Sequence, residues 1–430
     1  MKLPREIDYA SKPSSLPLGT SCISTVVVPS NGSSFNSATQ DIIIFDLPSR
    51  GYIVPSSMYI RYKATTSGYA GATSYRGTPA YAPFAKLETI IGSQVVESIN
   101  QYGQLCNIIV NLKMNNSGKS GLAPGLGYAD SATTASVALT NVNCNGRLLP
   151  ATPDNSFFSA PLGCLFSNAD KLVPLKFMPG CRIQLTMDAL ANIFYAATTT
   201  PTACTITNME LCFDLIDFPA SVDEAVLSMA DGNGKIFVKS QSYLSSGQTM
   251  ASASQGSLEF IYNYRLASIK SLILNQSGTG ATSLNRAYDS FDFTKGNGAY
   301  QFFVASMPYP QRPLSTVQNK AGILTELAST MGPAHDVLTN QLGVSPASFA
   351  RVDGDTSTIA LPAQFWVGTN TERLSTNAVM LSGVSSQNSP ISLRIDLGTA
   401  TSNAGVLQLI ALYDAIIEVD VANKQVSILQ

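Results

Sequence analysis

A single histidine, His335, limits the acid–base and metal chemistry open to this 430-residue chain. One histidine cannot build a multi-histidine metal site, and it leaves a single candidate for histidine general-base catalysis. It follows Gly332-Pro333-Ala334, a combination typical of a loop, so we interpret it as structural or solvent-exposed. The sequence also contains no G-x-S-x-G nucleophile motif.

Two short segments contain fragments of ligand-binding loops. Gly118-Lys119-Ser120 matches the end of a phosphate-binding loop, but the full motif requires a glycine where Lys113 stands. Asp353-Gly354-Asp355 pairs two carboxylates that could bind calcium, yet the other ligands of a loop site are missing. We interpret neither segment as a ligand site.

The run Tyr262-Asn263-Tyr264-Arg265 combines aromatic and basic residues that could stack on nucleic-acid bases. Its tyrosines alternate with other residues as they would on one side of a strand, so we interpret them as sheet residues. A net charge of -2 and a pI near 5.5 also argue against a broad nucleic-acid surface. We therefore expect no catalysis, no cofactor and no bound metal.

The composition points instead to contact between copies. Charged residues make up 13% of the chain, against about 25% in average globular proteins, and the mean hydropathy is +0.13. Because subunit interfaces are depleted in charge, we infer that much of the surface is buried against other copies of the chain. A low-charge secreted β protein is the alternative.

The cysteines and the N-terminal sequence indicate the cellular compartment in which the protein folds. An odd number of cysteines without a C-x-x-C pair predicts free thiols rather than zinc or a disulfide framework. The N-terminus lacks the apolar core of a signal peptide, and no run of about 18 apolar residues occurs, so we expect a soluble, non-exported protein. The seven cysteines are Cys22, Cys106, Cys144, Cys164, Cys181, Cys204 and Cys212.

Alternating apolar and polar residues predict β-strands along most of the chain. The stretch from Phe157 to Phe194 predicts three of them: a run ending near Pro161, a second entering through Val173-Pro174-Leu175, and a third around Ile183. On the third, one side of the sheet should face a core. The opposite side carries Arg182, Gln184 and Thr186 and should face water or another barrel.

Two helices interrupt the predicted strands. One follows a strand hairpin at Leu87–Val96 and has an apolar face formed by Ile99, Tyr102, Leu105, Cys106, Ile109 and Leu112. The other spans Thr316–Met331. It follows a predicted strand at Tyr300–Met307 and a Pro-rich turn at Pro308–Pro313. Each half of the chain thus contains strands, one helical excursion and further strands, which suggests two copies of one β fold.

The predicted domain organisation has four parts. Residues 1–19 contain prolines at 4, 13 and 17 and no periodicity, which favours an extended N-terminal arm, with a disordered tail as the alternative. We assign an assembly role to the first arm residues, Lys2, Leu3, Pro4 and Arg5. Residues 20–218 form a first β domain, 219–234 a linker with a short helix, and 235–430 a second β domain.

Five segments in this order resemble one known family. They are LETIIGSQVVESINQYGQLCNIIV, FFSAPLGCLFSNADKLVPLKFMPGCRIQLTM, YQFFVASMPYPQRPL, VMLSGVSSQNSPISLRIDL and LIALYDAIIEVDVANKQVSIL. The chain resembles the double jelly-roll major capsid proteins of the lineage that includes adenovirus hexon, tectivirus coat proteins and the capsid proteins of Polinton-like viruses and virophages. The resemblance rests on the order of the five segments over both halves.

The resemblance implies an all-β fold of two tandem eight-stranded antiparallel jelly-roll barrels with short helical excursions. It implies a major capsid protein that forms homotrimers, since three chains of two barrels approximate six-fold symmetry, and that tiles the icosahedral shell of a DNA virus. The implied partners are copies of itself, then penton and minor capsid proteins, with an internal membrane left open and no sequence-specific nucleic acid. The implied location is the virion, after synthesis inside the host cell.

Two other classes of function remain open. A β-sandwich receptor- or carbohydrate-binding surface protein would present an exposed aromatic platform, whereas Trp366, the one tryptophan, lies in an apolar segment. An enzyme on a β scaffold would need a catalytic constellation, and the residue pattern offers none.

Overall fold

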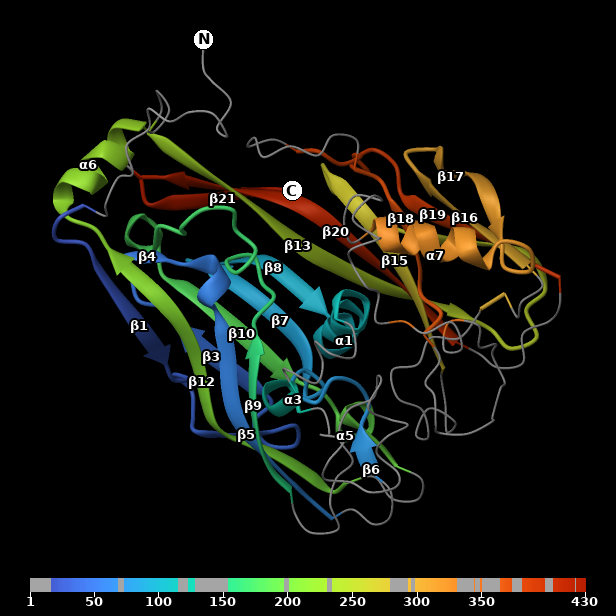
Figure 1. Cartoon of the computed structure of the whole chain (residues 1–430), viewed down its shortest axis with the longest axis horizontal. Helices are drawn as coiled ribbons and strands as arrows, with labels where there is room; N and C mark the ends of the chain where they lie inside the picture. The colour runs from blue at the N-terminus through green and yellow to red at the C-terminus, as the bar shows by residue number, and fades with distance from the viewer. Residues whose placement is uncertain are drawn as a thin grey trace, which may run out of the picture.

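Strands dominate the computed structural model of the chain (Figure 1). The structure describes residues 17–68, 73–114, 123–127, 154–196, 201–229, 234–278, 293–294, 298–330, 344, 349, 364–372, 381–398, 405–421 and 423–430. Four large antiparallel sheets contain nearly all of the described strands. No helix in these residues is both long and apolar enough to cross a membrane.

The first half of the chain forms two facing sheets of four principal strands each. One has the order β1-β12-β5-β9 and the other the order β3-β10-β7-β8. The short strands β2 (Ser34–Asn36) and β4 (Tyr52–Ile53) add to β12, and β6 (Thr73–Tyr75) pairs with β11 (Phe194–Ala196). The principal strands are β1 (Ser21–Val27), β3 (Ile42–Asp46), β5 (Tyr59–Ser67), β7 (Phe84–Ile91), β8 (Gln94–Asn100), β9 (Asp154–Pro161), β10 (Cys181–Met187) and β12 (Ala203–Asp217).

The second half forms two further sheets. Their orders are β13-β20-β15-β18, with β21 (Gln425–Leu429) added to β20, and β14-β19-β16-β17. The principal strands are β13 (Lys235–Met250), β14 (Gly256–Tyr262), β15 (Ile269–Gly278), β16 (Gly298–Val304), β17 (Met307–Ser315), β18 (Val367–Asn370), β19 (Ile391–Leu397) and β20 (Gly405–Asp420).

Both halves have one topology. When the eight principal strands of each half are counted along the chain, one sheet runs first, eighth, third, sixth and the other second, seventh, fourth, fifth. Two four-stranded sheets connected in this way form a jelly roll. The predicted fold class, two tandem eight-stranded antiparallel jelly-roll barrels with short helical excursions, is confirmed.

The helices occupy corresponding places in the two barrels. α1 (Tyr102–Lys113) and α7 (Lys320–Ser329) each follow the fifth principal strand, where the two helices were predicted. Ile99, which was assigned to the first helix face, belongs instead to β8. The Asn319 side chain caps α7 by accepting a hydrogen bond from the Gly322 amide, 3.0 Å away. α6 (Ala220–Met229) lies between the barrels in sequence, where a short helix was predicted, and α3 (Ala123–Leu126), α5 (Leu190–Ile193), η2 (Pro55–Ser57) and η3 (Leu175–Phe177) are single turns.

Strand β10 shows how alternating apolar and polar residues form one wall of the barrel. Ile183 and Leu185 are fully buried between the sheets, because side chains two residues apart project to the same face of a strand. β10 pairs with β3 on one side and β7 on the other, so it lies in the interior of its sheet. The predicted strand around Ile183 is confirmed.

Two predicted elements were wrong. Pro308–Pro313 is not a turn but part of β17, which among the described strands pairs with β16 alone. An edge strand needs hydrogen bonds on only one side, and therefore tolerates proline. The strand predicted through Val173-Pro174-Leu175 is a single bridge from Val173 to Ile53 followed by η3, because Pro174 has no N–H to continue a ladder.

The limits of the four predicted parts, 1–19, 20–218, 219–234 and 235–430, stay predictions. Residues 1–16 of the predicted arm lie outside the described residues. In the described part, no sheet combines strands from β1–β12 with strands from β13–β21. In the described residues the two jelly rolls therefore share no sheet. Their association must come from other contacts.

We predict that Ile183→Asp prevents folding to a soluble protein. The substitution would place an unpaired carboxylate between two sheets and lower the free energy of unfolding by about 4 kcal/mol or more. The soluble fraction after expression, and chemical denaturation of any variant protein that stays soluble, would measure the loss. Arg182→Gln is the control, because the adjacent Arg182 side chain is 55% exposed and its surface ion pair contributes about 1 kcal/mol or less. Equal stability of Ile183→Asp and the wild type would contradict the burial of Ile183.

Candidate assembly surfaces

The residues singled out for chemistry do not form a catalytic site in the described structure. Tyr262 ends β14, Tyr264 follows it, and both rings are buried. Their hydroxyls donate to the carbonyls of Leu407 and Leu409 at 2.9 and 2.6 Å. Rings in this position brace the barrel and cannot stack on bases.

The remaining candidates fall outside the described residues. They are His335, Gly118-Lys119-Ser120, Asp353-Gly354-Asp355 and the arm residues Lys2, Leu3, Pro4 and Arg5. Among the residues that the structure does describe, no group of three or more His, Cys, Asp and Glu side chains could hold a metal ion. Six of the cysteines lie in this part as free thiols, and five of the six are buried.

Trp366 provides no aromatic platform for a carbohydrate. The side chain is 1% exposed, and its indole Nε1 donates to Asn275 Oδ1 at 3.1 Å inside the second barrel. A sugar-stacking surface would require an exposed ring face. The tryptophan is instead a packing residue with its one polar group satisfied.

The two barrels meet at a polar contact centred on Glu97 of β8. Glu97 Oε2 accepts hydrogen bonds from Thr89 Oγ1 at 2.5 Å and from the Leu165 amide at 2.9 Å. Glu97 Oε1 accepts a hydrogen bond from Ser242 Oγ on β13 of the second barrel. The carboxyl is 2% exposed, and burial raises the pKa of Glu97 although all three hydrogen bonds act in the opposite direction.

Edge strand β13 receives further partners from the first barrel. The Asp170 amide donates to the Lys239 carbonyl at 2.9 Å, and Asn168 Nδ2 donates to the Gln241 carbonyl at 3.1 Å. In return, Ser240 Oγ donates to the Leu165 carbonyl at 2.5 Å. An open sheet edge exposes backbone groups that attract other strands. The first barrel therefore covers an edge of the second, and Figure 1 shows β13 and β20 running from the second barrel across to β8.

A buried charge cluster joins this contact to the core sheet of the second barrel. Asp414 of β20 is fully buried, and Lys239 Nζ and Lys270 Nζ each lie 3.8 Å from its Oδ1. Its Oδ2 accepts hydrogen bonds from Ser268 Oγ and the Ser382 amide, both at 2.9 Å. Lys239 thus contacts the first barrel through its carbonyl and Asp414 through its ammonium group.

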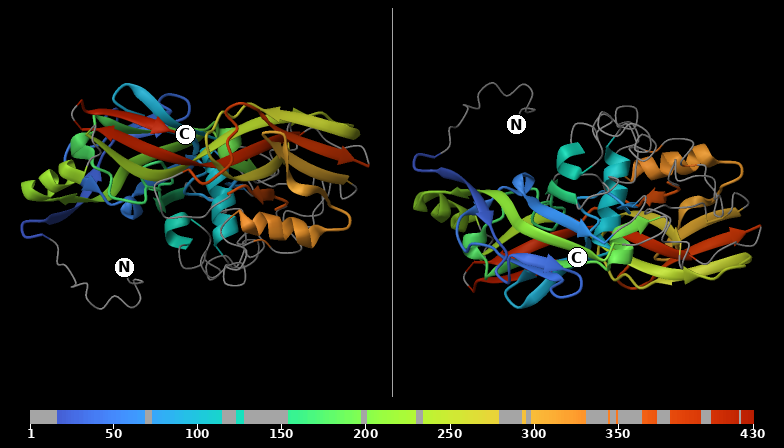
Figure 2. Two further views of the ribbon diagram at one scale, coloured as in Figure 1. Left: turned by 90° about the horizontal axis from the view of Figure 1, so that it is seen from above. Right: turned by 90° about the horizontal axis from the view of Figure 1, so that it is seen from below.

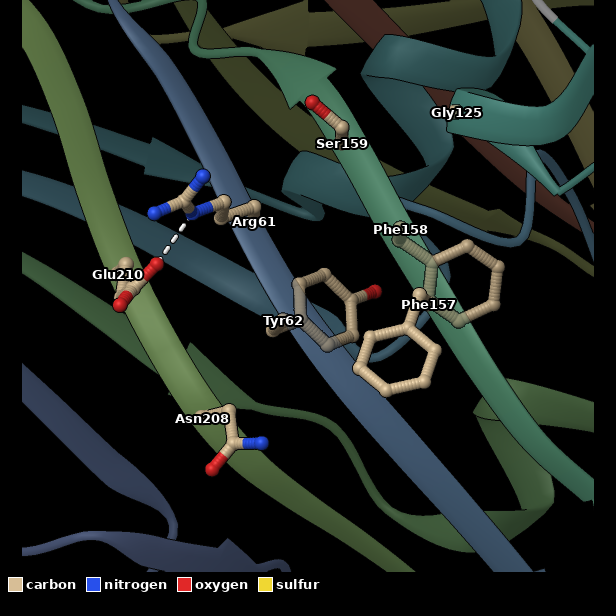
Figure 3. Close-up of a pocket in the computed structure, with 8 residues that line it drawn as sticks. All are labelled: Arg61, Tyr62, Gly125, Phe157, Phe158, Ser159, Asn208 and Glu210. Atoms are coloured by element: carbon tan, nitrogen blue, oxygen red, sulfur yellow. Dashed lines mark hydrogen bonds and ion pairs between the residues drawn. The ribbon is translucent and has the colours of Figure 1, made fainter.

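An open depression of about 610 Å³ lies on the outer face of the first barrel, over β12, β5 and β9 (Figure 3). Arg61 forms an ion pair with Glu210 there. The Phe157 ring is 64% exposed, and Lys63 Nζ lies 5.4 Å from its centroid. The lining contains no histidine or cysteine. An exposed aromatic ring beside charged groups suits contact with a macromolecular surface.

Exposed apolar side chains also lie on two edge strands. Ile23 and Val26 on β1 are 42% and 47% exposed, and Val28 beyond its end is 63% exposed. Met307 at the start of β17 and Val317 just past its end are 50% and 58% exposed. In the described residues β1 pairs with β12 alone and β17 with β16 alone. Both strands therefore present a free edge together with apolar surface.

Contact with another barrel was one of the two alternatives predicted for the polar side of β10. Arg182 donates to Asp46 on β3 at 2.5 Å, and Gln184 donates to Glu88 on β7 at 3.1 Å. These bonds stay within one sheet, and no contact with the second barrel is seen for them in the described structure.

The sequence analysis did not identify Glu97 as part of a contact between the barrels. The available signal was a lone carboxylate in the apolar segment VVESIN.

The raised pKa of Glu97 predicts a pH-dependent stability. When a carboxyl has a higher pKa in the folded chain than in the unfolded chain, the folded state binds more protons, so the free energy of unfolding falls as pH rises. The free energy of unfolding should begin to fall near pH 4.5, the ordinary pKa of a glutamate side chain. The limiting slope of this fall is about 1.4 kcal/mol per pH unit. Glu97→Gln should remove this component, as measured by urea unfolding from about pH 4 to pH 8.

Glu97→Ala serves as the second arm of that experiment. It leaves the buried Leu165 amide without an acceptor, and should cost about 1 to 3 kcal/mol across the pH range. The glutamine keeps an acceptor for Leu165 and can donate to Ser242. If the wild type and Glu97→Gln show the same slope with pH, the carboxyl does not titrate as assigned.

Solved structures similar to this one are capsid proteins. No model of a known protein family matches the sequence, and no curated protein matches it. The capsid protein of PBCV-1 superposes with a TM-score of 0.59 at 11% identity, covering 98% of this chain and 99% of that one. The Faustovirus major capsid protein gives a TM-score of 0.61 at 10% identity, covering 95% and 92%.

The major capsid protein of mavirus is a third similar structure, with a TM-score of 0.54 at 9% identity over 100% of this chain and 95% of that chain. Identities this low establish shared architecture, and the coverage extends it over both barrels. The chain therefore has the double jelly-roll fold of viral major capsid proteins.

Proposed function

We propose that the chain is a major capsid protein of a DNA virus. The observation that carries the proposal is the duplication of one barrel, with the two copies joined by the buried contact between Glu97 and Ser242. The similar structures from PBCV-1, Faustovirus and mavirus are capsid proteins with the same overall arrangement. The low charge of 13% supports extensive contact between copies.

The functional unit is a homotrimer. Three chains of two barrels provide six similar units around one axis, and this pseudo-hexagonal outline allows capsomers to tile an icosahedral shell. The partners are other copies of the chain, then neighbouring capsomers, penton proteins and minor capsid proteins. The virion is the location, and the chain acts there without catalysis, cofactor or sequence-specific nucleic-acid binding.

Native mass spectrometry and negative-stain imaging of the purified chain test the proposal. We expect trimers with a hexagonal outline that form shells or sheets when concentration or salt is changed. A monodisperse monomer that forms neither trimers nor shells at any pH or salt would overturn the proposal. A small oligomer that binds glycans and forms no shells would favour the surface-protein alternative.

We further propose that residues 1–19 are an arm that contacts a neighbouring capsomer, through residues that include Lys2, Leu3, Pro4 and Arg5. Deleting the arm should leave trimers intact but weaken shell formation, as seen by imaging at matched trimer concentration. A control chain in which a Gly/Ser segment of equal length replaces the arm separates the effect of sequence from that of length. Normal shells from the deleted chain would show that the segment is only a tail.

A further inference from the structure

We infer that Lys270 and Asp414 of the second barrel join in an intramolecular isopeptide bond, with Glu372 as the proton acceptor. The bond is a covalent modification within one chain, so it goes beyond the proposed assembly and does not depend on it. Four charged side chains, each at most 18% exposed, gather at this place in the second barrel. They are Lys239, Lys270, Glu372 and Asp414.

The strand order brings two lysines to one carboxylate. Asp414 lies on β20, which runs between β13 and β15 in its sheet, and Figure 2 shows β20 in red beside β13 in yellow-green. Asp414 lies opposite Gln241 of β13, so Lys239, two residues earlier, projects from the same face. Lys270 lies on β15 where its register with β20 shifts, and such an irregularity redirects a side chain. The lysines therefore approach Asp414 from both neighbouring strands.

The two carboxylate oxygens of Asp414 have different surroundings. Oδ2 accepts hydrogen bonds from Ser268 Oγ and from the Ser382 amide, both at 2.9 Å. Oδ1 is buried and has no hydrogen-bond donor within reach among the described residues, while Lys239 Nζ and Lys270 Nζ each lie 3.8 Å away. Donors fixed on one oxygen stabilise the negative charge that develops there when a nucleophile adds to the carboxyl carbon. Oδ2 is thus placed as the retained oxygen and Oδ1 as the leaving oxygen.

Glu372 distinguishes Lys270 from Lys239 as the nucleophile. Its Oε1 lies 3.1 Å from Lys270 Nζ, whereas the one ion pair of Lys239 in the described residues is with Asp414. A lysine must give up a proton before its nitrogen can attack a carbonyl carbon, and an adjacent carboxylate can accept that proton. Ser382 Oγ lies 2.8 Å from the same Glu372 oxygen and 2.9 Å from Asp414 Oδ2, so it holds the base beside the carboxyl group.

The reaction is a condensation that needs no oxidant, reductant or co-reactant. The nitrogen lone pair of Lys270 forms a bond to the carboxyl carbon of Asp414, and the bond from that carbon to Oδ1 breaks. Two protons leave the nitrogen, the first through Glu372, and both end on Oδ1, which departs as water. The amide keeps Oδ2 with its donors. One positive and one negative charge disappear from a buried site, where charges are costly, and Lys239 and Glu372 remain as opposite charges.

Intact mass spectrometry of the purified, denatured full chain tests the inference. The mass should be lower than the sequence mass by one water, about 18 Da. A tryptic digest should contain one branched peptide that joins the segments around Lys270 and Asp414, without cleavage after Lys270. A chain at the full sequence mass would overturn the inference. A water loss located within a single linear peptide, as a cyclised aspartate would give, would overturn it as well.

Three variants identify the roles. Lys270→Arg keeps the positive charge but has no primary amine, and Glu372→Gln removes the proton acceptor, so both should keep the full sequence mass. Lys239→Arg is the matched control and should still lose water, because Lys239 faces the same Oδ1 from the other strand. Water loss in Lys270→Arg, or its absence in Lys239→Arg alone, would contradict the assignment of Lys270.

Folding of the variants does not limit the test. If one of them is insoluble, the branched peptide of the wild type still identifies the joined lysine. Native mass spectrometry of the same wild-type samples reports trimers separately. Trimers at the full sequence mass would overturn the isopeptide bond and leave the proposed function intact, whereas cross-linked monomers that never assemble would overturn the proposed function alone.

Discussion

The need to satisfy an open sheet edge explains why the two barrels form one unit. The backbone carbonyls of Lys239 and Gln241 on β13 would face solvent in an isolated second barrel, and the first barrel provides donors for both. Glu97 adds a buried carboxyl that receives three hydrogen bonds, one of them from across the contact. A polar contact of this kind fixes the relative position of the barrels more narrowly than apolar packing would, since hydrogen bonds require particular distances and angles.

Much of the fold could be predicted from the sequence, because jelly-roll strands and helices leave local signals. The alternation around Ile183 reflects one-sided burial, which sequence periodicity records directly. The apolar spacing from Tyr102 to Leu112 marked α1, although the helix is buried on most sides and not on one face alone. Pro308–Pro313 was misjudged because a proline-rich run reads as a turn unless its place at a sheet edge is known. Strand order decides that place, and strand order depends on contacts far apart in the sequence.

The candidate surfaces were much harder to predict than the fold. Glu97, Ser242 and Leu165 come from three separate segments, and only the packing of one barrel on the other brings them together. No chemical motif marks such a contact, since hydroxyls, amides and single carboxylates occur throughout the chain. The lack of a required chemical motif also explains why capsid proteins that share the architecture are only 9 to 11% identical to this chain. A barrel needs alternating apolar residues and compatible side-chain volumes, and many sequences provide both.

The three prolines of β17 also affect how a strand-rich chain avoids aggregation. Newly folded β proteins at high concentration partition between ordered assembly and irreversible edge-to-edge aggregation. By removing N–H donors from an exposed edge, Pro308, Pro310 and Pro313 slow the second route without blocking contacts made through side chains. The yield of soluble protein would then depend on backbone chemistry at one strand as much as on contacts made through side chains.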